Sequence, residues 1–256
     1  MIRALWNSRS GMQAMQDKID GISNNISNSE TTGYKKVDVS FKDLVYEQLE
    51  RNGYPTNKNG VNQHLTGSGV KATGWLRQDT QGTLAATGTD SDLAVEGSGY
   101  FKVTQANGTD AYTRDGNFNL DSKGKLVDSE GNRVEVNFNG NVNTLVKGKF
   151  IINDDGSVVD NSTGKSLTVG KINLYQVVGQ DSMLSVGNNL YTLKTGTQVN
   201  VVNDAKIKQG SLEGSNVDIT TEMTDMIAAQ RAFELSSKGL TTIDTMMGLI
   251  NNLKGN

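Results

Sequence analysis

Apolar residues recur with heptad spacing at both ends of this 256-residue chain. In residues 218–254 they fall every seven residues, and the positions three later are apolar in the second half of the segment. This spacing predicts a long helix with a narrow apolar seam at each end of the chain. The seam over residues 1–28 has a polar residue only at Ser8 and otherwise consists of Leu5, Met12, Met15, Ile19, Ile22 and Ile26. The later seam includes Ile219, Met226, Phe233, Leu240, Ile243, Met247 and Ile250.

Both predicted helices need a partner for their seams. Gly11 and Gly21 each lower the stability of the first helix by up to ~1 kcal/mol relative to alanine. The two seams can pair with each other within one molecule, or they can also pack against other subunits. Two narrow-seamed helices alone bury little surface, which favours packing between subunits. We therefore predict that the seam residues are subunit-interface residues, and that the chain ends are unfolded in the monomer and helical in the polymer.

The middle of the chain changes from helical to strand periodicity. Val134, Val136 and Phe138 alternate with polar residues, and Ile172, Leu174 and Val178 share one parity. Such alternation predicts half-buried strands. Turn residues recur between the apolar runs, which indicates an antiparallel β domain. The expected turns are Asn107-Gly108, Ser122-Lys123-Gly124, Glu130-Gly131-Asn132, Asp154-Asp155-Gly156 and Gly187-Asn188-Asn189.

Residues 116–128 and 148–160 form a weak internal repeat. Each copy is expected to be a strand, a tight turn and a second strand. Two copies do not make a repeat architecture. The similarity has two explanations, duplication or convergence of two hairpins on the same turn chemistry.

Residues 34–75 fit neither pattern clearly. Phe41, Leu44, Val45 and Leu49 have the spacing of a short amphipathic helix, and the polar, Gly/Asn-rich residues 51–70 follow it. A structureless stretch of this length is more often functional than incidental. We predict that residues 46–70 form an arm that contacts a neighbouring subunit and stiffens the assembly.

These patterns predict an α+β fold, with long terminal helices forming a coiled-coil-like pair around a central antiparallel β domain. The expected division is an N-terminal helical assembly segment (1–33), a linker and extended arm (34–75), a β-rich outer domain (76–213) and a C-terminal helical assembly segment (214–256).

Composition excludes several kinds of chemistry. There is no cysteine and one histidine, His64, so thiol nucleophiles, Cys-ligated zinc and multi-His metal sites are excluded. His64 is expected to be a solvated surface residue, and we expect no catalytic, cofactor or metal site. A net charge of −3 argues against nucleic-acid binding. No segment has the ~20 apolar residues of a membrane span, and the N-terminus lacks the apolar core of a secretory signal.

Three groups of motifs resemble bacterial flagellar rod and hook proteins, in the order that the family has them. The first runs from Ile22 to Lys36, the second includes residues 92–101 and 112–118, and the third runs from Glu213 to Glu234. The resemblance covers nearly the whole chain. Its signature residues in this sequence are Asn24, Asn25, Asn28, Thr32, Gly33, Tyr34, Lys35, Ser215, Asn216, Val217, Gln230 and Arg231.

The resemblance implies a structural axial subunit of the flagellar basal body rather than an enzyme. Such a subunit is exported unfolded by the flagellar type III apparatus without a cleaved signal. It polymerises outside the cytoplasmic membrane into a helical rod that transmits torque to the hook. Its implied partners are further copies of itself, other rod and hook subunits and the export apparatus, without stable membrane insertion.

Within the family the chain most resembles the distal rod branch, because of the segment around residues 46–70. The proximal rod branch of similar length shares the motifs near residues 212–217 and 223–227, so it stays a close alternative. A rival from another class is a secreted β-domain adhesin or glycan-binding protein with helical oligomerisation ends. A β-rich hydrolase with an unrecognised carboxylate pair is a third possibility.

Overall fold

The computed structural model describes residues 2–44, 46–48, 65–138, 145–146, 148–161, 166–179, 182–202 and 204–254. His64 and most of the predicted arm lie outside these residues. The chain forms two compact units. The helical unit consists of residues 1–26, 37–76 and 219–256, and the β unit consists of residues 27–36 and 77–218.

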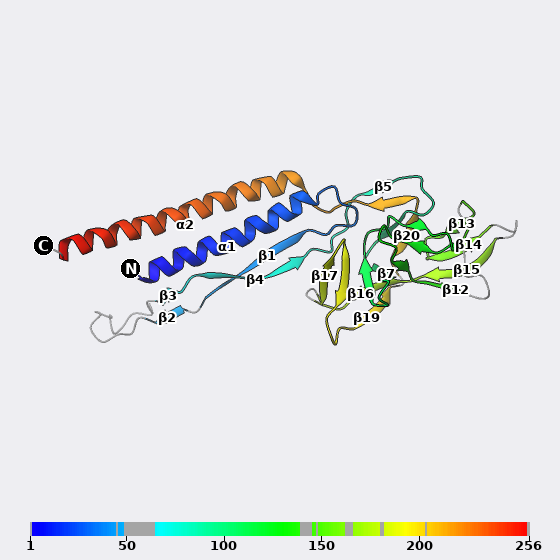
Figure 1. The fold of residues 1–256 in the computed structure, drawn as a ribbon, viewed down its shortest axis with the longest axis horizontal. Coiled ribbons are helices and arrows are strands. Elements are labelled where there is room, and N and C mark those ends of the chain that lie inside the picture. Colours follow the sequence, from blue (N-terminus) through cyan, green and yellow to red (C-terminus); the bar gives the residue numbers. More distant parts are fainter. Residues whose placement is uncertain are drawn as a thin grey trace. The chain divides into compact units, whose positions relative to one another are not determined.

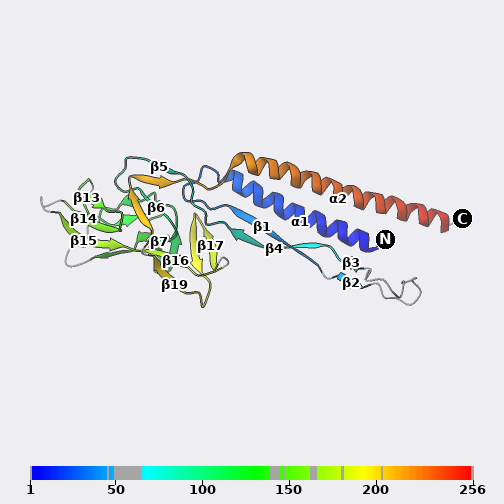
Figure 2. The same cartoon turned by 180° about the vertical axis from the view of Figure 1, so that it is seen from behind.

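The helical unit contains the two predicted helices. Helix α1 (Ile2–Ser27) and helix α2 (Ile219–Lys254) run side by side in opposite directions, with both chain ends at one end of the pair (Figures 1 and 2). Their bounds agree with the helices that the seven-residue spacing predicts over residues 1–28 and 218–254. Strands β1 (Val37–Asp43) and β4 (Val70–Arg77) pair with each other and lie along α1. Strands β2 (Tyr46–Gln48) and β3 (Leu65–Gly67) form a second, short pair.

The short amphipathic helix expected around Phe41 to Leu49 is wrong. Phe41 belongs to strand β1, and the strand β2 follows. In β1, Val37, Val39 and Phe41 alternate with polar residues, which is the two-residue period of a strand. Pairing with β4, about 30 residues later in the chain, satisfies the backbone of β1 and selects this period.

The β unit is antiparallel, as predicted. Its largest sheet has nine strands, with the path β17-β18-β8-β7-β11-β10-β9; β16 pairs with β7, and β19 pairs with β16. A four-stranded sheet has the order β12-β15-β14-β13, and two further pairs are β20–β6 and β21–β5. The strands up to β12 are β5 (Leu84–Ala86), β6 (Leu93–Glu96), β7 (Tyr100–Thr104), β8 (Asp110–Thr113), β9 (Asn119–Leu120), β10 (Leu126–Val127), β11 (Arg133–Val134) and β12 (Val136–Phe138). The later strands are β13 (Phe150–Ile152), β14 (Ser157–Asp160), β15 (Leu167–Ile172), β16 (Leu174–Val177), β17 (Met183–Gly187), β18 (Leu190–Leu193), β19 (Val199–Val202), β20 (Lys206–Gln209) and β21 (Ser211–Glu213).

The predicted turns connect these strands. Asn107 and Gly108 join β7 to β8, and Gly108 adopts a positive φ of 82°. The other four turn motifs join β9 to β10, β10 to β11, β13 to β14 and β17 to β18. The two copies of the internal repeat have the same strand register, since Leu120 faces Leu126 and Ile152 faces Val158.

Two apolar clusters fill the β unit. The larger one is fully buried and includes Leu93, Val95, Phe101, Val103, Phe118, Leu126, Ile172 and Ile207. The smaller cluster consists of three tyrosines, Tyr100, Tyr112 and Tyr191, together with Met183, and Tyr175 packs against it. Val134, Ile172 and Leu174 are buried as the alternation predicts, whereas Val178 lies beyond the end of β16 and is exposed.

Candidate assembly interface

Helices α1 and α2 meet in one continuous antiparallel register. Asn25 Nδ2 donates to Glu222 Oε2 at 3.0 Å, Gly11 lies against Ser236, and Gly239 lies against Ser8. In each pair the two residue numbers add up to 247. Because each α-helical residue advances by the same rise, this register holds along the whole contact.

Glycine and serine let the two helices approach closely. A Cβ placed on Gly11 would lie 3.3 Å from Ser236 Oγ, and one on Gly239 would lie 3.2 Å from Ser8 Oγ. The polar Ser8 of the predicted seam is thus a contact residue. The other predicted helix-weakening glycine of α1, Gly21, faces Val39 and Trp75 of the strands instead. Gly11 therefore both weakens the isolated helix and allows it to pack against α2.

Within one chain, most of the predicted seam residues are at least partly buried. Ile22 is buried, and the other five apolar seam residues of α1 are half-buried. In α2 the five seam residues from Met226 to Met247 are half-buried, whereas Ile219 and Ile250 are exposed. That these residues contact other subunits stays a prediction.

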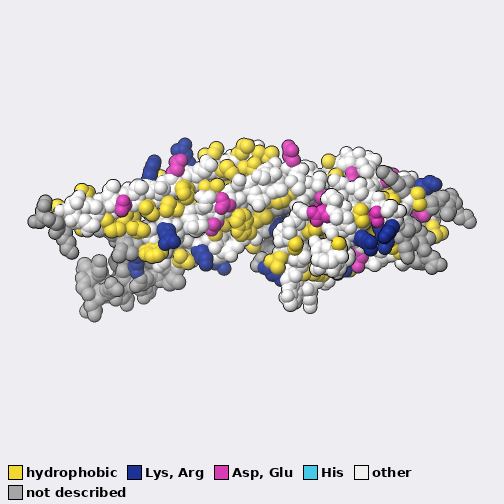
Figure 3. Space-filling model, viewed as in Figure 1, with side chains coloured by type: hydrophobic (Ala, Val, Ile, Leu, Met, Phe, Trp, Pro, Cys, Tyr) yellow, Lys and Arg dark blue, Asp and Glu magenta, His cyan; other side chains and the backbone are white. Residues whose placement is uncertain are grey.

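Helix α2 also carries apolar side chains that the heptad analysis missed. They lie off the seam and are exposed. Helix α2 is longer than α1, and its second half has few charges. Hydrophobic side chains are visible along the outer edge of the helix pair in Figure 3. A count of apolar residues on the other faces of the helix would have revealed them: Met223, Ile227, Leu235, Met246, Leu249 and Leu253.

Asn25 links three elements of the helical unit. Its Nδ2 donates to the carbonyl oxygen of Val37 at 3.0 Å as well as to Glu222, and its Oδ1 accepts from the amide of Val37 at 3.0 Å. Asn25 and Glu222 are both buried. An amide side chain offers two donors and an acceptor, which is what this position uses. Asn25 therefore fixes α1 against β1 and α2.

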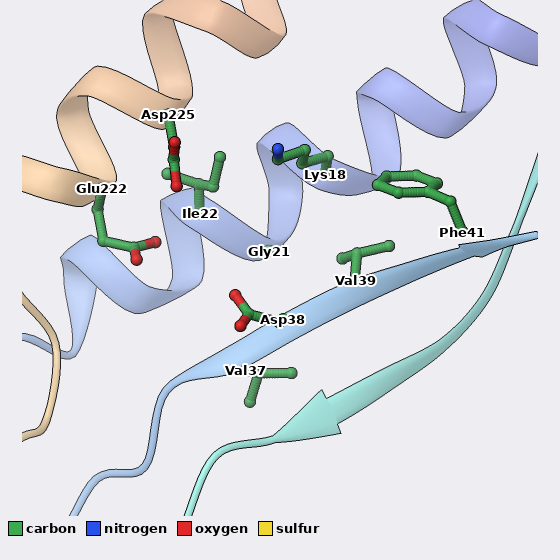
Figure 4. Close-up of a pocket in the computed structure, with 9 residues that line it drawn as sticks. All are labelled: Lys18, Gly21, Ile22, Val37, Asp38, Val39, Phe41, Glu222 and Asp225. Atoms are coloured by element: carbon green, nitrogen blue, oxygen red, sulfur yellow. The ribbon is translucent and has the colours of Figure 1, made fainter. Parts of the chain in front are cut away.

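A small pocket lies beside this link, between α1, β1 and α2. Figure 4 shows Glu222 and Asp225 extending from α2 on one side and Val37, Val39 and Phe41 on β1 on the other. Its volume is about 330 Å³. Among the residues that the structure describes, no group of three His, Cys, Asp or Glu side chains is placed to hold a metal ion.

In the β unit, Glu213 is held between two cations. Lys35 Nζ lies 2.6 Å from Glu213 Oε1, and Arg114 Nη1 lies 2.9 Å from Glu213 Oε2. All three side chains are buried. Each side chain also makes a hydrogen bond to the backbone. Lys35 donates to the Thr80 carbonyl oxygen, and Arg114 donates to the Gly97 carbonyl oxygen. Glu213 accepts from the amide of Gly82. Such a buried triad is stable only when every charged group has partners.

Burial lowers the pKa of Lys35, and the hydrogen bond and charge of Glu213 oppose this shift. The ion pair therefore keeps an otherwise unfavourable buried ammonium charged. Lys35 belongs to the N-terminal portion of the chain, Arg114 to its middle and Glu213 to its end, so the triad joins segments that are far apart in sequence.

Two further signature positions support this junction. Gly33 has a φ of 66°, and its amide donates to the Glu213 carbonyl oxygen at 2.8 Å. A Cβ there would lie 2.4 Å from the backbone nitrogen of Asp115, so glycine is required. Asn216 accepts from the amide of Lys36 and donates to the carbonyl oxygens of Gln78 and Thr80.

Three family models match successive parts of the chain. They are the flagella basal body rod protein model over residues 5–35, the flagellar hook protein FlgE/F/G D1 domain over residues 94–160, and the flagellar basal body rod FlgEFG protein C-terminal model over residues 208–253. The flagellar basal-body rod protein FlgG of Borreliella burgdorferi is 37% identical, and the alignment covers 99% of both chains. FlgG of Bacillus subtilis is 38% identical over 99% of this chain and 100% of its own.

The chain belongs to the flagellar basal-body rod protein family.

The flagellar hook-basal body complex protein FlhP of Bacillus subtilis is also similar, at 32% identity over 99% of this chain and 100% of its own. These matches confirm the resemblance found in the sequence motifs. Neither described helix of this rod-family chain has the length and apolar character to cross a membrane.

Each family-matched segment contributes one member of the buried triad. Lys35 ends the first segment, Arg114 lies in the second, and Glu213 lies near the start of the third. The separately matched parts of this rod protein are therefore joined by one set of charges. The motifs suggested the family but did not reveal this junction.

The remaining signature residues have different surroundings. Tyr34 is buried, and Thr32 donates to Asp115 Oδ1 at 2.9 Å. Asn28 accepts from Thr31, and the Ser215 hydroxyl accepts from the amide of Val217 at 3.3 Å. In contrast, Asn24, Gln230 and Arg231 lie on the exposed surface of the helices. An exposed position leaves these side chains accessible to another subunit.

Proposed function

We propose that this chain is a subunit of the distal part of the flagellar basal-body rod, where it polymerises and transmits torque from the motor to the hook. Membership of the rod family supports the structural role. Full-length similarity to proteins named FlgG supports the distal position. The proximal rod is the alternative position.

The observation that carries the assembly proposal is the exposed apolar surface of α2. A single chain leaves Met223, Ile227 and Leu249 largely in water although they lie on a regular helix. Burying one such side chain completely contributes roughly 1.5–3 kcal/mol. Contacts between copies in the polymer would recover this free energy, and part of it would offset the ordering of the helices.

In this proposal residues 1–33 and 214–256 are the assembly segments, residues 34–75 are a linker with an arm, and residues 76–213 are the outer domain. The predicted interface residues of α1 and α2 contact neighbouring copies as well as each other. Further partners are other rod and hook subunits. The flagellar export apparatus delivers the chain as an unfolded polypeptide, and weakly stable helices would limit polymerisation before export.

The test is to replace the gene with a tagged copy and to isolate basal bodies by detergent extraction. Electron microscopy with a label against the tag is expected to mark the rod segment next to the hook. A label at the opposite end of the rod would move the chain to the proximal position. Motile cells whose purified basal bodies lack the chain would overturn the proposal. A tagged β-unit protein that is absent from basal bodies but binds glycans would favour the adhesin alternative.

A further inference from the structure

Helix α2 extends beyond helix α1 at one end of the helical unit. The shared register places Ile2, the first residue of α1, opposite Thr245. Met246–Lys254 therefore continue past α1 by about nine residues, or ~13 Å. Within the described structure α1 cannot cover these last turns.

This overhang is apolar and exposed. Leu253 is 82% exposed, Leu249 is 64% exposed, and Met246 and Ile250 are each about half exposed. The segment contains no acidic residue, and its one charged residue is the lysine at its end. We call these four side chains the distal patch. Apolar side chains at i, i+3, i+4 and i+7 are typical of a helix that packs against another apolar surface.

A second apolar surface lies at the other end of the same helix. Ile219, Met223 and Ile227 are spaced four residues apart and are 41%, 53% and 59% exposed. We call these three side chains the proximal patch. The upper edge of α2 in Figure 3 shows hydrophobic side chains over its first half. The two patches lie at opposite ends of one helix. A contact between a distal patch and a proximal patch therefore needs two copies of the chain.

We propose that the distal patch of one copy packs against the proximal patch of a second copy, so that α2 helices join head to tail. This rests on the proposed function, which requires an open polymer of this chain. A contact between two different patches leaves one of each free at the ends of the pair, so addition continues instead of closing. The centres of the two patches are about 27 residues apart along α2, which sets a repeat of ~40 Å along the joined helices.

The absence of cysteine makes this contact directly testable. The double variant Met223→Cys/Leu253→Cys places one thiol in each patch of the full chain. After polymerisation, a short-spacer bismaleimide is expected to give a ladder of cross-linked multimers. Mixing the two single variants should give dimers and no longer species. Within one straight helix the two positions are about 30 residues, or ~45 Å, apart, so a short reagent cannot join them in the same chain.

The matched control is Leu235→Cys/Leu253→Cys. Leu235 is as exposed as the patch residues but lies in the middle of α2, outside both patches. This control should give no ladder. Polymers that form normally but give no ladder with the Met223/Leu253 pair would overturn the head-to-tail contact while leaving the rod function intact. Cross-links to a different protein, or equal ladders from the control pair, would also overturn it. Failure of the unmodified chain to enter a rod at all would instead overturn the proposed function.

Discussion

Lys35 Nζ lies 2.6 Å from Glu213 Oε1, and neither side chain is accessible to solvent. The pair joins residues that are 178 positions apart, and Arg114 approaches the other carboxylate oxygen. In a rod subunit this contact connects the segment that follows α1 with the segment that precedes α2, and it ties both to the β sheet through Arg114. The β unit is therefore expected to hold the two connections to the helices at a fixed separation.

Removing the negative charge of this junction should be strongly destabilising. In Glu213→Gln, Lys35 and Arg114 stay buried without a counter-charge, and we expect a loss of about 3–5 kcal/mol in the free energy of unfolding. Urea unfolding of the monomer measures it. The control is Glu96→Gln, which removes an exposed pair with Lys208 at 3.7 Å and should cost about 0–1 kcal/mol. Equal losses for the two variants would contradict a role for the buried triad.

Gly33→Ala should prevent the close approach of the N-terminal connection to Asp115. The positive φ alone costs an alanine about 1–2 kcal/mol, and the clash of its Cβ with backbone adds to that. Gly108→Ala is the matched control, because Gly108 also has a positive φ but nothing lies within 4 Å of the place that an alanine Cβ would take there. Thermal unfolding should show a clearly larger loss for Gly33→Ala, and a loss no larger than that of the control would refute the steric argument.

Asn25→Ala should loosen the helical unit. It removes hydrogen bonds to both β1 and α2 and leaves buried polar groups without this partner, which costs about 1–3 kcal/mol per group. Circular dichroism at the helical minimum, followed while the assembled polymer is heated, measures the effect, because both chain ends are expected to be helical in the polymer. The control is Gln16→Ala. The exposed Gln16 side chain bonds to Asp20 four residues later, and its loss should change the free energy of unfolding by only about 0.2–0.5 kcal/mol. Superimposable melting curves for the two variants would show that Asn25 does not join the elements.

The β unit should lose stability in alkaline solution. Burial raises the pKa of Tyr100, Tyr112 and Tyr191, and burial with the hydrogen bond to Glu135 raises the pKa of Tyr175 to about 12. The folded chain therefore keeps phenolic protons that the unfolded chain loses near pH 10. Because the folded state binds more protons in this range, the free energy of unfolding falls as pH rises from about 10 to 12. The lowered pKa of Lys35 acts in the opposite direction, because the folded chain loses this proton at a lower pH than the unfolded chain does. Its effect ends above about pH 10.5, where both states have lost the proton, and it is one group against four.

Urea unfolding at a series of pH values, with tyrosinate absorbance recorded in parallel, tests this dependence. Tyr175→Phe removes one of the four ionisations and should make the fall with pH shallower. A free energy of unfolding that stays constant across this range would contradict the expected pKa shifts.

Local sequence patterns were sufficient for much of the fold. The heptads predicted α1 and α2, and turn residues such as Asn107 and Gly108 predicted the hairpins, because helix periodicity and turn chemistry are read within a few neighbouring residues. The same local reasoning failed at Phe41, where a helical spacing and a strand alternation overlap. Pairing of β1 with β4 decided that case, and this pairing joins residues far apart in the chain.

By itself the sequence therefore determined the element types, the antiparallel character of the β unit and, through its motifs, the family. Only the tertiary structure decided that Lys35, Arg114 and Glu213 form one buried triad and that the register of α1 and α2 leaves Met246–Lys254 uncovered. The physical reason is that burial and charge pairing depend on which distant segments meet. A heptad gives a helix its apolar face, but the helix that lies opposite determines which part of that face stays in water.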